Sequence, residues 1–255
     1  MIALVGNLSR DLKPGQPPRA GGGPYHGARA LNRLRVPARI AARCAREDKD
    51  ELLPQLVALG SPVRYVPGTS TATYAFTYEG DVRRMRIEAV GDTWLPDDLP
   101  ELPDAVRWVH VAPLARSDFP SETLAALARR RRVSFDGQGL VRAPHTGDLE
   151  LNADFDPEVL RHVWVLKLAD EEADVIGDTS TLRVRELLLT HGSRGSTVVV
   201  GGKREFVPAR AVDADPTGAG DAYCAAYLVA RSAGFAPVGA ARRATAVVAS
   251  LLAEQ

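Results

Sequence analysis

Cysteine, methionine and aromatic residues are scarce in this chain, and its net charge is zero. Its 255 residues include only two cysteines, which is too few for a disulfide framework or a cysteine-rich metal site. Cys44 and Cys224 fall in apolar stretches of helical character, where free buried thiols are common. Basic and acidic residues number 32 each, so the charge balance favours neither a nucleic acid nor an anionic membrane as partner.

Long apolar runs are also missing. No stretch approaches the roughly 20 apolar residues of a membrane span. The short apolar run at residues 1–8 lacks the basic lead and the length of a secretory signal, so we expect a cytoplasmic protein. The basic run at 129–132 ends a helical pattern, where positive charge complements the helix dipole.

Short apolar runs that alternate with amphipathic segments predict an α/β fold. The alternation predicts a mostly parallel sheet between two layers of helices, a three-layer αβα sandwich in a single domain of residues 1–255. Between 63 and 90 the pattern changes to two or three antiparallel strands, which predicts a small, reduced β lid. Strands are expected at 1–5, 36–42, 106–111, 133–136, 163–168 and 197–200, and helices at 25–34, 50–59, 121–130 (with Ser121 as cap), from 170, 221–233 and 237–253.

The most informative segment is Asp-Pro-Thr-Gly-Ala-Gly-Asp at 215–221, directly before an apolar helical run. Gly218, Ala219 and Gly220 have little or no side chain, so their N–H groups and the positive helix end can receive an anion. Asp221 stands beside that anion, where a carboxylate can take a proton from a hydroxyl while phosphoryl charge develops. On these grounds alone, a small-molecule kinase and an ordinary capped turn are equal alternatives.

The order of residues in this segment resembles the C-terminal signature of the PfkB, or ribokinase-like, kinase family. The resemblance extends over nearly the whole chain and implies a ribokinase-like fold with ATP and Mg²⁺ as cofactors. It implies that Asp221 is the base that activates the acceptor hydroxyl. It also places the anion hole at 218–220 and Thr217 on the nucleotide side.

Two N-terminal features resemble the family's acceptor site. Asp11 follows the first predicted strand, at the edge of the sheet where α/β proteins bind ligands, and an ionised carboxylate can accept hydrogen bonds from two hydroxyls. Gly21 and Gly22 match a glycine pair that lets a sugar approach the backbone. The family's asparagine four residues later is replaced by His26. Alternatives are a turn aspartate and a surface histidine.

Two further segments resemble the family's nucleotide site. Thr190, Gly192 and Gly195 match a Thr-x-Gly-x-x-Gly loop that offers amides and a hydroxyl to phosphates, although a hairpin turn also needs glycine. Glu172 matches a glutamate that organises Mg²⁺ through water, but the paired asparagine is replaced by alanine. Lys167 can supply positive charge to the phosphates, or else it is a strand-end lysine that extends to solvent.

The segments 136–142 and 166–173 resemble the plant-type myo-inositol kinase branch of the family. This makes Gln138 a candidate acceptor contact. We therefore predict a kinase for a hydroxyl of a sugar or polyol, as a monomer or homodimer. A nucleoside kinase is the first alternative and would need an aromatic wall from Tyr74, Phe76 or Tyr78. A binding regulator without catalysis is the second alternative.

Overall fold

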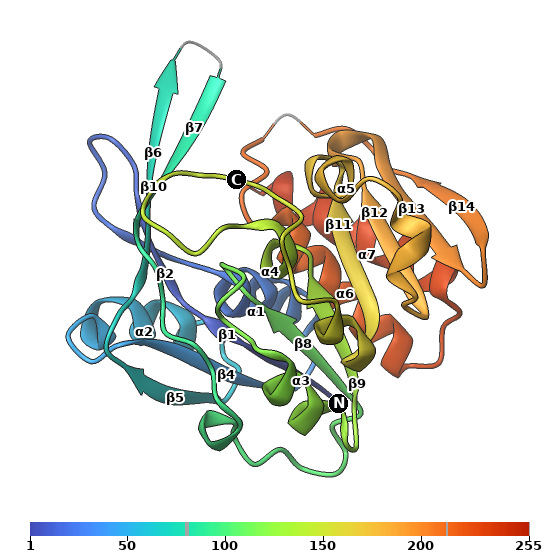
Figure 1. The fold of residues 1–255 in the computed structure, drawn as a ribbon, viewed down its shortest axis with the longest axis horizontal. Helices are drawn as coiled ribbons and strands as arrows, with labels where there is room; N and C mark the ends of the chain where they lie inside the picture. The colour runs from blue at the N-terminus through green and yellow to red at the C-terminus, as the bar shows by residue number, and fades with distance from the viewer. Residues whose placement is uncertain (80–81, 213, 255) are drawn as a thin grey trace.

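A computed structural model describes residues 1–79, 82–212 and 214–254 of the chain. The larger of its two sheets has nine strands, in the order β14-β13-β12-β11-β9-β8-β1-β4-β5 (Figure 1). The seven strands β12, β11, β9, β8, β1, β4 and β5 run parallel to one another. Strands β13 and β14 add an antiparallel hairpin at the β12 edge. The strands are β1 (Ile2–Asn7), β4 (Ala38–Ala45), β5 (Val63–Gly68), β8 (Trp108–Ala112), β9 (Arg132–Asp136), β11 (Val163–Ala169), β12 (Glu186–Thr190), β13 (Gly195–Val200) and β14 (Lys203–Pro208).

Two hydrophobic cores lie on the two faces of this sheet. Strand β1 shows why: it is buried along its whole length, and Ile2 and Leu4 enter one core while Ala3 and Val5 enter the other. The arrangement confirms the predicted mostly parallel sandwich. The first core is covered by α1 (Gly23–Leu34), α2 (Lys49–Val57), α6 (Ala219–Ser232) and α7 (Pro237–Leu252), and the second by α3 (Ser121–Ala128), α4 (Gln138–Val141), α5 (Asp170–Ile176) and 3-10 turns at Pro96–Asp98, Pro157–His162 and Thr179–Leu182.

The smaller sheet is the lid, and it differs from the prediction. The sequence predicts two or three strands within 63–90, but β5 pairs with β4 in the large sheet, and the lid has five strands. Strands β2 and β10 join the lid over long sequence separations, as Ser9 does with Ala72, and β3 is a three-residue strand beside β2, so no local pattern reveals them. The lid order is β10 (Gly147–Asp148), β7 (Val82–Ala89), β6 (Ala72–Glu79), β2 (Ser9–Leu12) and β3 (Arg19–Gly21).

The predicted helices are present with ends shifted by a few residues, and three local expectations are wrong. Strand β12 is absent from the prediction. Pro120 precedes the first turn of α3, so Ser121 is not its cap. Cys44 lies in strand β4 instead of a helix, although both cysteines are free and buried. In the described part of the chain, no helix is long and apolar enough to cross a bilayer.

Candidate active site

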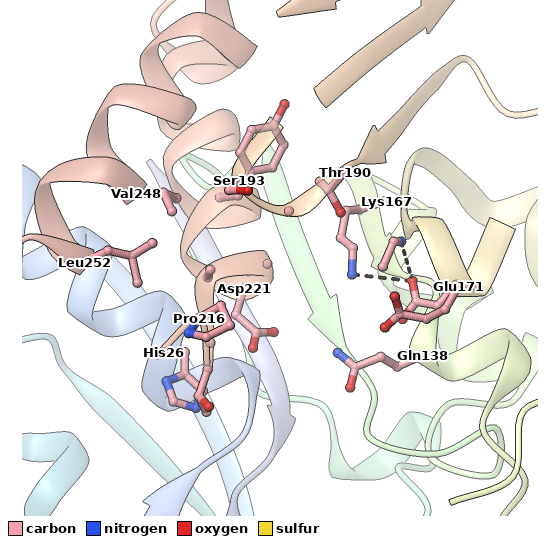
Figure 2. A pocket seen from close by; sticks show the side chains of 18 of the residues that line it. His26, Gln138, Lys167, Glu171, Thr190, Ser193, Pro216, Asp221, Val248 and Leu252 are labelled. Carbon is pink, nitrogen blue, oxygen red and sulfur yellow. Dashed lines mark hydrogen bonds and ion pairs between the residues drawn. The ribbon is translucent and has the colours of Figure 1, made fainter. Parts of the chain in front are cut away.

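A cavity of about 690 Å³ lies where the lid meets the carboxyl ends of the parallel strands (Figure 2). This is the edge at which open α/β sheets bind ligands. The cavity brings together residues from distant parts of the sequence. Of the residues predicted for the site, it is lined by Asp11, Gly22, His26, Gln138, Lys167, Glu172, Thr190, Gly192, Gly195, Thr217, Gly218, Ala219, Gly220 and Asp221.

The start of helix α6 forms one wall of the cavity. Gly218 caps the helix with φ of 78°, a left-handed conformation that favours glycine. The expectation of three free amides is wrong for Ala219, whose N–H donates to the carbonyl of Pro216 at 2.9 Å in the turn before the helix. Among the described residues, the amides of Gly218 and Gly220 have no acceptor, so these two remain for an anion.

Asp221 points into the cavity from the first turn of α6 (Figure 2). It is only 8% exposed, and its Oδ1 has no hydrogen-bond partner among the described residues. Burial, reinforced by the charge of Asp136, raises the pKa of Asp221 to about 7, although Lys167 and Arg142 act in the opposite direction. A carboxyl group with this pKa can accept a proton near neutral pH.

The glycine segment at the start of α1 makes room for two carboxylates. A Cβ at Gly23 would lie 2.8 Å from Asp221 Oδ1 and 2.0 Å from the Cβ of Ala112. A Cβ at Gly21 would lie 2.5 Å from Asp11 Oδ2, so Gly21 makes room for this carboxylate without lining the cavity. The sequence prediction omits Gly23, although the run of three glycines was a visible signal.

Asp11 lies on the opposite side of the cavity, on lid strand β2. It is 9% exposed, and Ser9 Oγ donates a hydrogen bond to Asp11 Oδ1 at 2.7 Å. This bond fixes the orientation of the carboxylate toward the cavity. Asp11 from lid strand β2 and Asp221 from helix α6 therefore line one cavity.

His26 is buried against the start of α6 (Figure 2). A Cβ at Gly218 would lie 2.1 Å from His26 Nδ1, so the ring packs directly on this glycine. Burial, followed by the charge of Arg29, lowers the pKa of His26 to about 4. The imidazole is therefore neutral at ordinary pH, which suits packing and hydrogen bonding better than proton transfer.

Lys167 lines the cavity and contacts two carboxylates. Its Nζ lies 3.1 and 3.2 Å from the two oxygens of Asp136 and 3.4 Å from Glu172 Oε2, as Figure 2 shows in part. It is also 3.4 Å from the position of a Cβ on Gly220, beside the free amides. Burial opposes the charged form, but Asp136 and Glu172 raise the pKa of Lys167. The ammonium is thus permanently charged at the anion site.

Glu172 is less free than the sequence suggests. Its Oε2 accepts the N–H of Ala169 at 2.7 Å, which caps helix α5, in addition to the contact with Lys167. Burial is the main cause of its raised pKa. The lysine and the backbone amide together hold the carboxylate that the prediction assigns to the metal.

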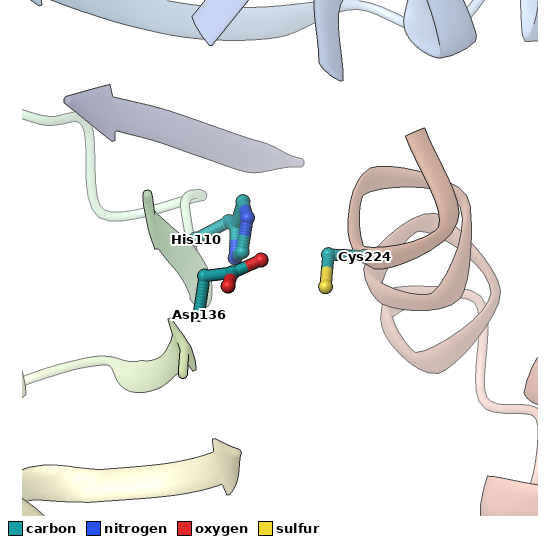
Figure 3. Close-up of side chains that lie close together, drawn as sticks. All are labelled: His110, Asp136 and Cys224. Carbon is teal, nitrogen blue, oxygen red and sulfur yellow. The ribbon is translucent and has the colours of Figure 1, made fainter. Parts of the chain in front are cut away.

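His110, Asp136 and Cys224 form a buried cluster below the cavity (Figure 3). Their potential ligand atoms lie within 4.8 Å of one another. Both Asp136 oxygens already accept from Lys167, so the ammonium supplies the positive charge that a metal ion would bring. We interpret the cluster as the group of buried side chains through which Asp136 holds the ammonium of Lys167 in place. The sequence prediction does not bring these three residues together.

The predicted nucleotide loop follows β12 and includes a 3-10 turn, Gly192–Arg194. Thr190 Oγ1 donates to the carbonyl of Leu168 at 3.3 Å, and Gly195 has φ of 124°. Across the cavity the sequence prediction misses an apolar wall from the loop after β14 and from α7. This wall is formed by Val212, Thr245, Val248, Ala249 and Leu252.

A second apolar wall comes mainly from the lid, for which the sequence names Tyr74, Phe76 and Tyr78 as candidates. It comprises Tyr74, Phe76, Met85, Leu114 and Leu149. Tyr74 and Phe76 are 4% and 3% exposed, and they point to the same face because they are two residues apart on β6. The side chain of Tyr78, the third predicted candidate for this wall, lies outside the described part of the chain.

Comparisons with known proteins place the chain in one family of kinases. The model of the pfkB family of carbohydrate kinases matches residues 19–255. The chain is 31% identical over 166 residues to an inositol 3-kinase of Zea mays, covering 62% of this chain and 42% of that protein. It is 34% identical over 156 residues to a fructokinase of Klebsiella pneumoniae, covering 54% of this chain and 50% of that protein. These matches thus span about half the length of the relatives.

Solved structures give the same fold over the whole chain. A pyrophosphate-dependent kinase of the ribokinase family, complexed with a pyrophosphate analogue and myo-inositol, superposes with a TM-score of 0.87 at 25% identity. The superposition covers 99% of this chain and 95% of that one. The fold is therefore ribokinase-like, as the sequence predicts.

Proposed function

The chain belongs to the pfkB family of carbohydrate kinases, and on that basis we propose that it transfers the terminal phosphoryl group of ATP to a hydroxyl of a small sugar or polyol. The observation that carries the proposal is the position of Asp221. This carboxylate, with a pKa of about 7, faces the cavity next to two free amides and a buried ammonium. A base beside an anion site is what hydroxyl phosphorylation requires.

The reaction proceeds in one transfer step. Asp221 takes the proton of the acceptor hydroxyl as the oxygen of that hydroxyl forms a bond to the terminal phosphorus of the donor. The bond to the leaving phosphate oxygen breaks, and its electron pair stays with the donor product. The amides of Gly218 and Gly220 and the ammonium of Lys167 stabilise the charge on the transferring group.

Acceptor binding is assigned to Asp11, Gln138 and the backbone at Gly22. The first two offer a carboxylate and an amide to neighbouring hydroxyls, which suits a cyclitol or a hexose. Support comes from the inositol 3-kinase and fructokinase among the relatives and from the myo-inositol in the superposed complex. His26 contributes by holding Gly218 in place.

The site also fits Mg²⁺. Three carboxylates, Asp136, Glu172 and Asp221, lie near two cations, Lys167 and Arg142, so negative charge remains for a metal ion. Glu172 would hold the ion through water, and the bound ion would neutralise charge on the donor phosphates. The phosphates themselves are assigned to Thr190, Gly192, Gly195 and Thr217.

A second candidate function is a nucleoside kinase. The buried aromatic wall of Tyr74 and Phe76 favours it, because these rings present an apolar surface to the acceptor half of the cavity. A base attached to ribose can pack on such a wall. The apolar face of a cyclitol ring can do the same, so the wall alone does not separate the two acceptors.

A panel of acceptors tests these alternatives. Inositols, hexoses, pentoses and nucleosides are each incubated with ATP or with pyrophosphate, and the phosphorylated product is measured. We expect an inositol or a hexose with ATP to give the highest kcat/KM. Turnover with nucleosides only would favour the second candidate. A raised melting temperature with a ligand and no product in any combination would indicate a binding protein.

The apolar wall of α7 can distinguish the two donors. ATP has a base that can pack on this wall, whereas pyrophosphate has no apolar group to contact it. Replacing Ala249 by leucine fills this wall, and we expect the KM for ATP to rise about 10-fold because overpacking costs at least about 1 kcal/mol. The matched control is Ala246→Leu on the exposed side of the same helix. Equal KM values for ATP in both variants, together with faster turnover of pyrophosphate, would assign pyrophosphate as the donor.

A further inference from the structure

Arg142 places a guanidinium in the cavity at a point that the proposed mechanism leaves unused. It directly follows α4, which begins at the carboxyl end of β9. Its backbone is fixed on both sides, since its N–H donates to the carbonyl of Gln138 at 3.0 Å and its carbonyl accepts from Arg116 at 3.1 Å. The side chain therefore starts from a rigid position on the acceptor side of the site.

The guanidinium of Arg142 has no carboxylate partner in the described residues within the 4.0 Å of an ion pair. Its neighbours differ: Arg116 donates to the carbonyls of Leu140 and Asn152, and Lys167 is paired with Asp136 and Glu172. Its charge acts from a distance on Asp118, Glu172 and Asp221. With no direct ion pair among the described residues, the guanidinium stays available to bind an anionic ligand.

The charge of Arg142 acts on the carboxylates of the proposed active site. It lowers the pKa of Asp221 and of Glu172, and it also acts on the hydroxyl of Tyr74 in the lid. Arg142 and Lys167 thus line the same cavity, and both act on Asp221 and Glu172.

We propose that Arg142 is a catalytic residue that binds the transferring phosphoryl group from the acceptor side. The inference rests on the proposed kinase function, and it adds a second cation to the transfer step. As the new oxygen–phosphorus bond forms and the donor bond breaks, the equatorial oxygens move toward Arg142. A planar guanidinium can donate two parallel hydrogen bonds to these oxygens.

The test is Arg142→Ala in the full chain, assayed with the best acceptor of the wild-type protein. We expect kcat to fall about 10³-fold, as for arginines that stabilise a phosphoryl transition state. The KM values for donor and acceptor should change little. Guanidine hydrochloride at millimolar concentration should restore part of kcat, which a purely structural role would not allow. Arg116→Ala is the control, and its kcat should not respond to guanidinium.

Three results would overturn the inference. An unchanged kcat in Arg142→Ala would remove Arg142 from the reaction and leave the proposed function intact. A higher acceptor KM with the wild-type kcat would make Arg142 an acceptor contact only. A wild-type protein that transfers phosphoryl to no acceptor would refute both proposals. If the alanine variant does not fold, Arg142→Gln keeps the packing volume, and the same kinetic criteria apply to it.

Discussion

Asp221→Asn is expected to lower kcat by about 10²- to 10⁴-fold while ATP still binds. Asparagine keeps the shape of the side chain but cannot accept the proton of the acceptor hydroxyl, and general-base catalysis contributes a factor of this size. Because Asp221 is buried with a free Oδ1, no nearby group replaces it. Product formation gives kcat, and calorimetry gives the Kd for ATP.

The pH profile of the wild-type protein identifies the same group. Below its pKa of about 7, Asp221 is protonated and cannot act as a base, so kcat/KM should fall about tenfold per pH unit on the acidic side. Asp118 provides a matched control, because burial also raises the pKa of this fully buried carboxyl to about 7 and it does not line the cavity. The Asp118→Asn variant should keep the acidic limb.

A second control lies in the same segment as Asp221. Asp215 is exposed and is held by Lys13 at 2.7 Å and by Thr217 Oγ1 at 2.6 Å, so its charge fixes the loop without reaching the acceptor. Asp215→Asn should reduce kcat much less than Asp221→Asn. Equal effects of the two changes would mean that loop geometry, and not proton transfer, explains the loss. Full activity of Asp221→Asn would refute the assigned base.

Most of the large sheet was predictable from the sequence because many of its strands are short apolar runs with helices between them, although β12 was missed and β5 was assigned to the lid. Strand β1 is an example, since burial on both faces requires apolar residues at every position. The lid was predictable only where its strands are adjacent in sequence, as in the hairpin of β6 and β7. Strands β2, β3 and β10 are two to four residues long; β2 and β10 pair with β6 and β7 far away in the sequence, and the short β3 pairs with β2. No local periodicity marks such pairs.

The site was predictable where function constrains the backbone. Gly218 and Gly22 occupy left-handed or close-packed positions, and such positions leave glycines in recognisable patterns. Side chains that meet only through the fold were not predictable. Arg142 follows α4 in an ordinary polar loop, and Val248 lies on an amphipathic helix like any core residue. Their common cavity depends on the three-dimensional arrangement of β9, α7 and the lid.

The charge arrangement below the cavity explains why Lys167 is central. Asp136 is fully buried and depends on the ammonium, which holds its pKa below the usual value against the effect of burial. The same ammonium limits the rise of the pKa of Asp221. One side chain therefore stabilises a buried carboxylate, sets the basicity of the catalytic carboxylate and approaches the anion site. These roles predict separate effects on stability and on catalysis.

Lys167→Met is expected to be the most damaging single change in stability. It leaves Asp136 as a buried charge without its counter-ion, which costs about 3–5 kcal/mol in the free energy of unfolding. It also removes a cation from the anion site, so kcat/KM should fall together with stability. The acidic limb of the pH profile should move above 7, because Asp221 loses a favourable charge. Urea denaturation and initial rates measure the two effects.

The double variant Lys167→Met with Asp136→Asn separates these roles. Removing both charges takes away the unpaired carboxylate, so most of the lost stability should return. Activity should not return, because the anion site still lacks its cation. If the double variant recovers both stability and kcat/KM, the lysine serves only to neutralise Asp136, and the amides at the start of α6 with Arg142 must carry the transferring phosphoryl group without it.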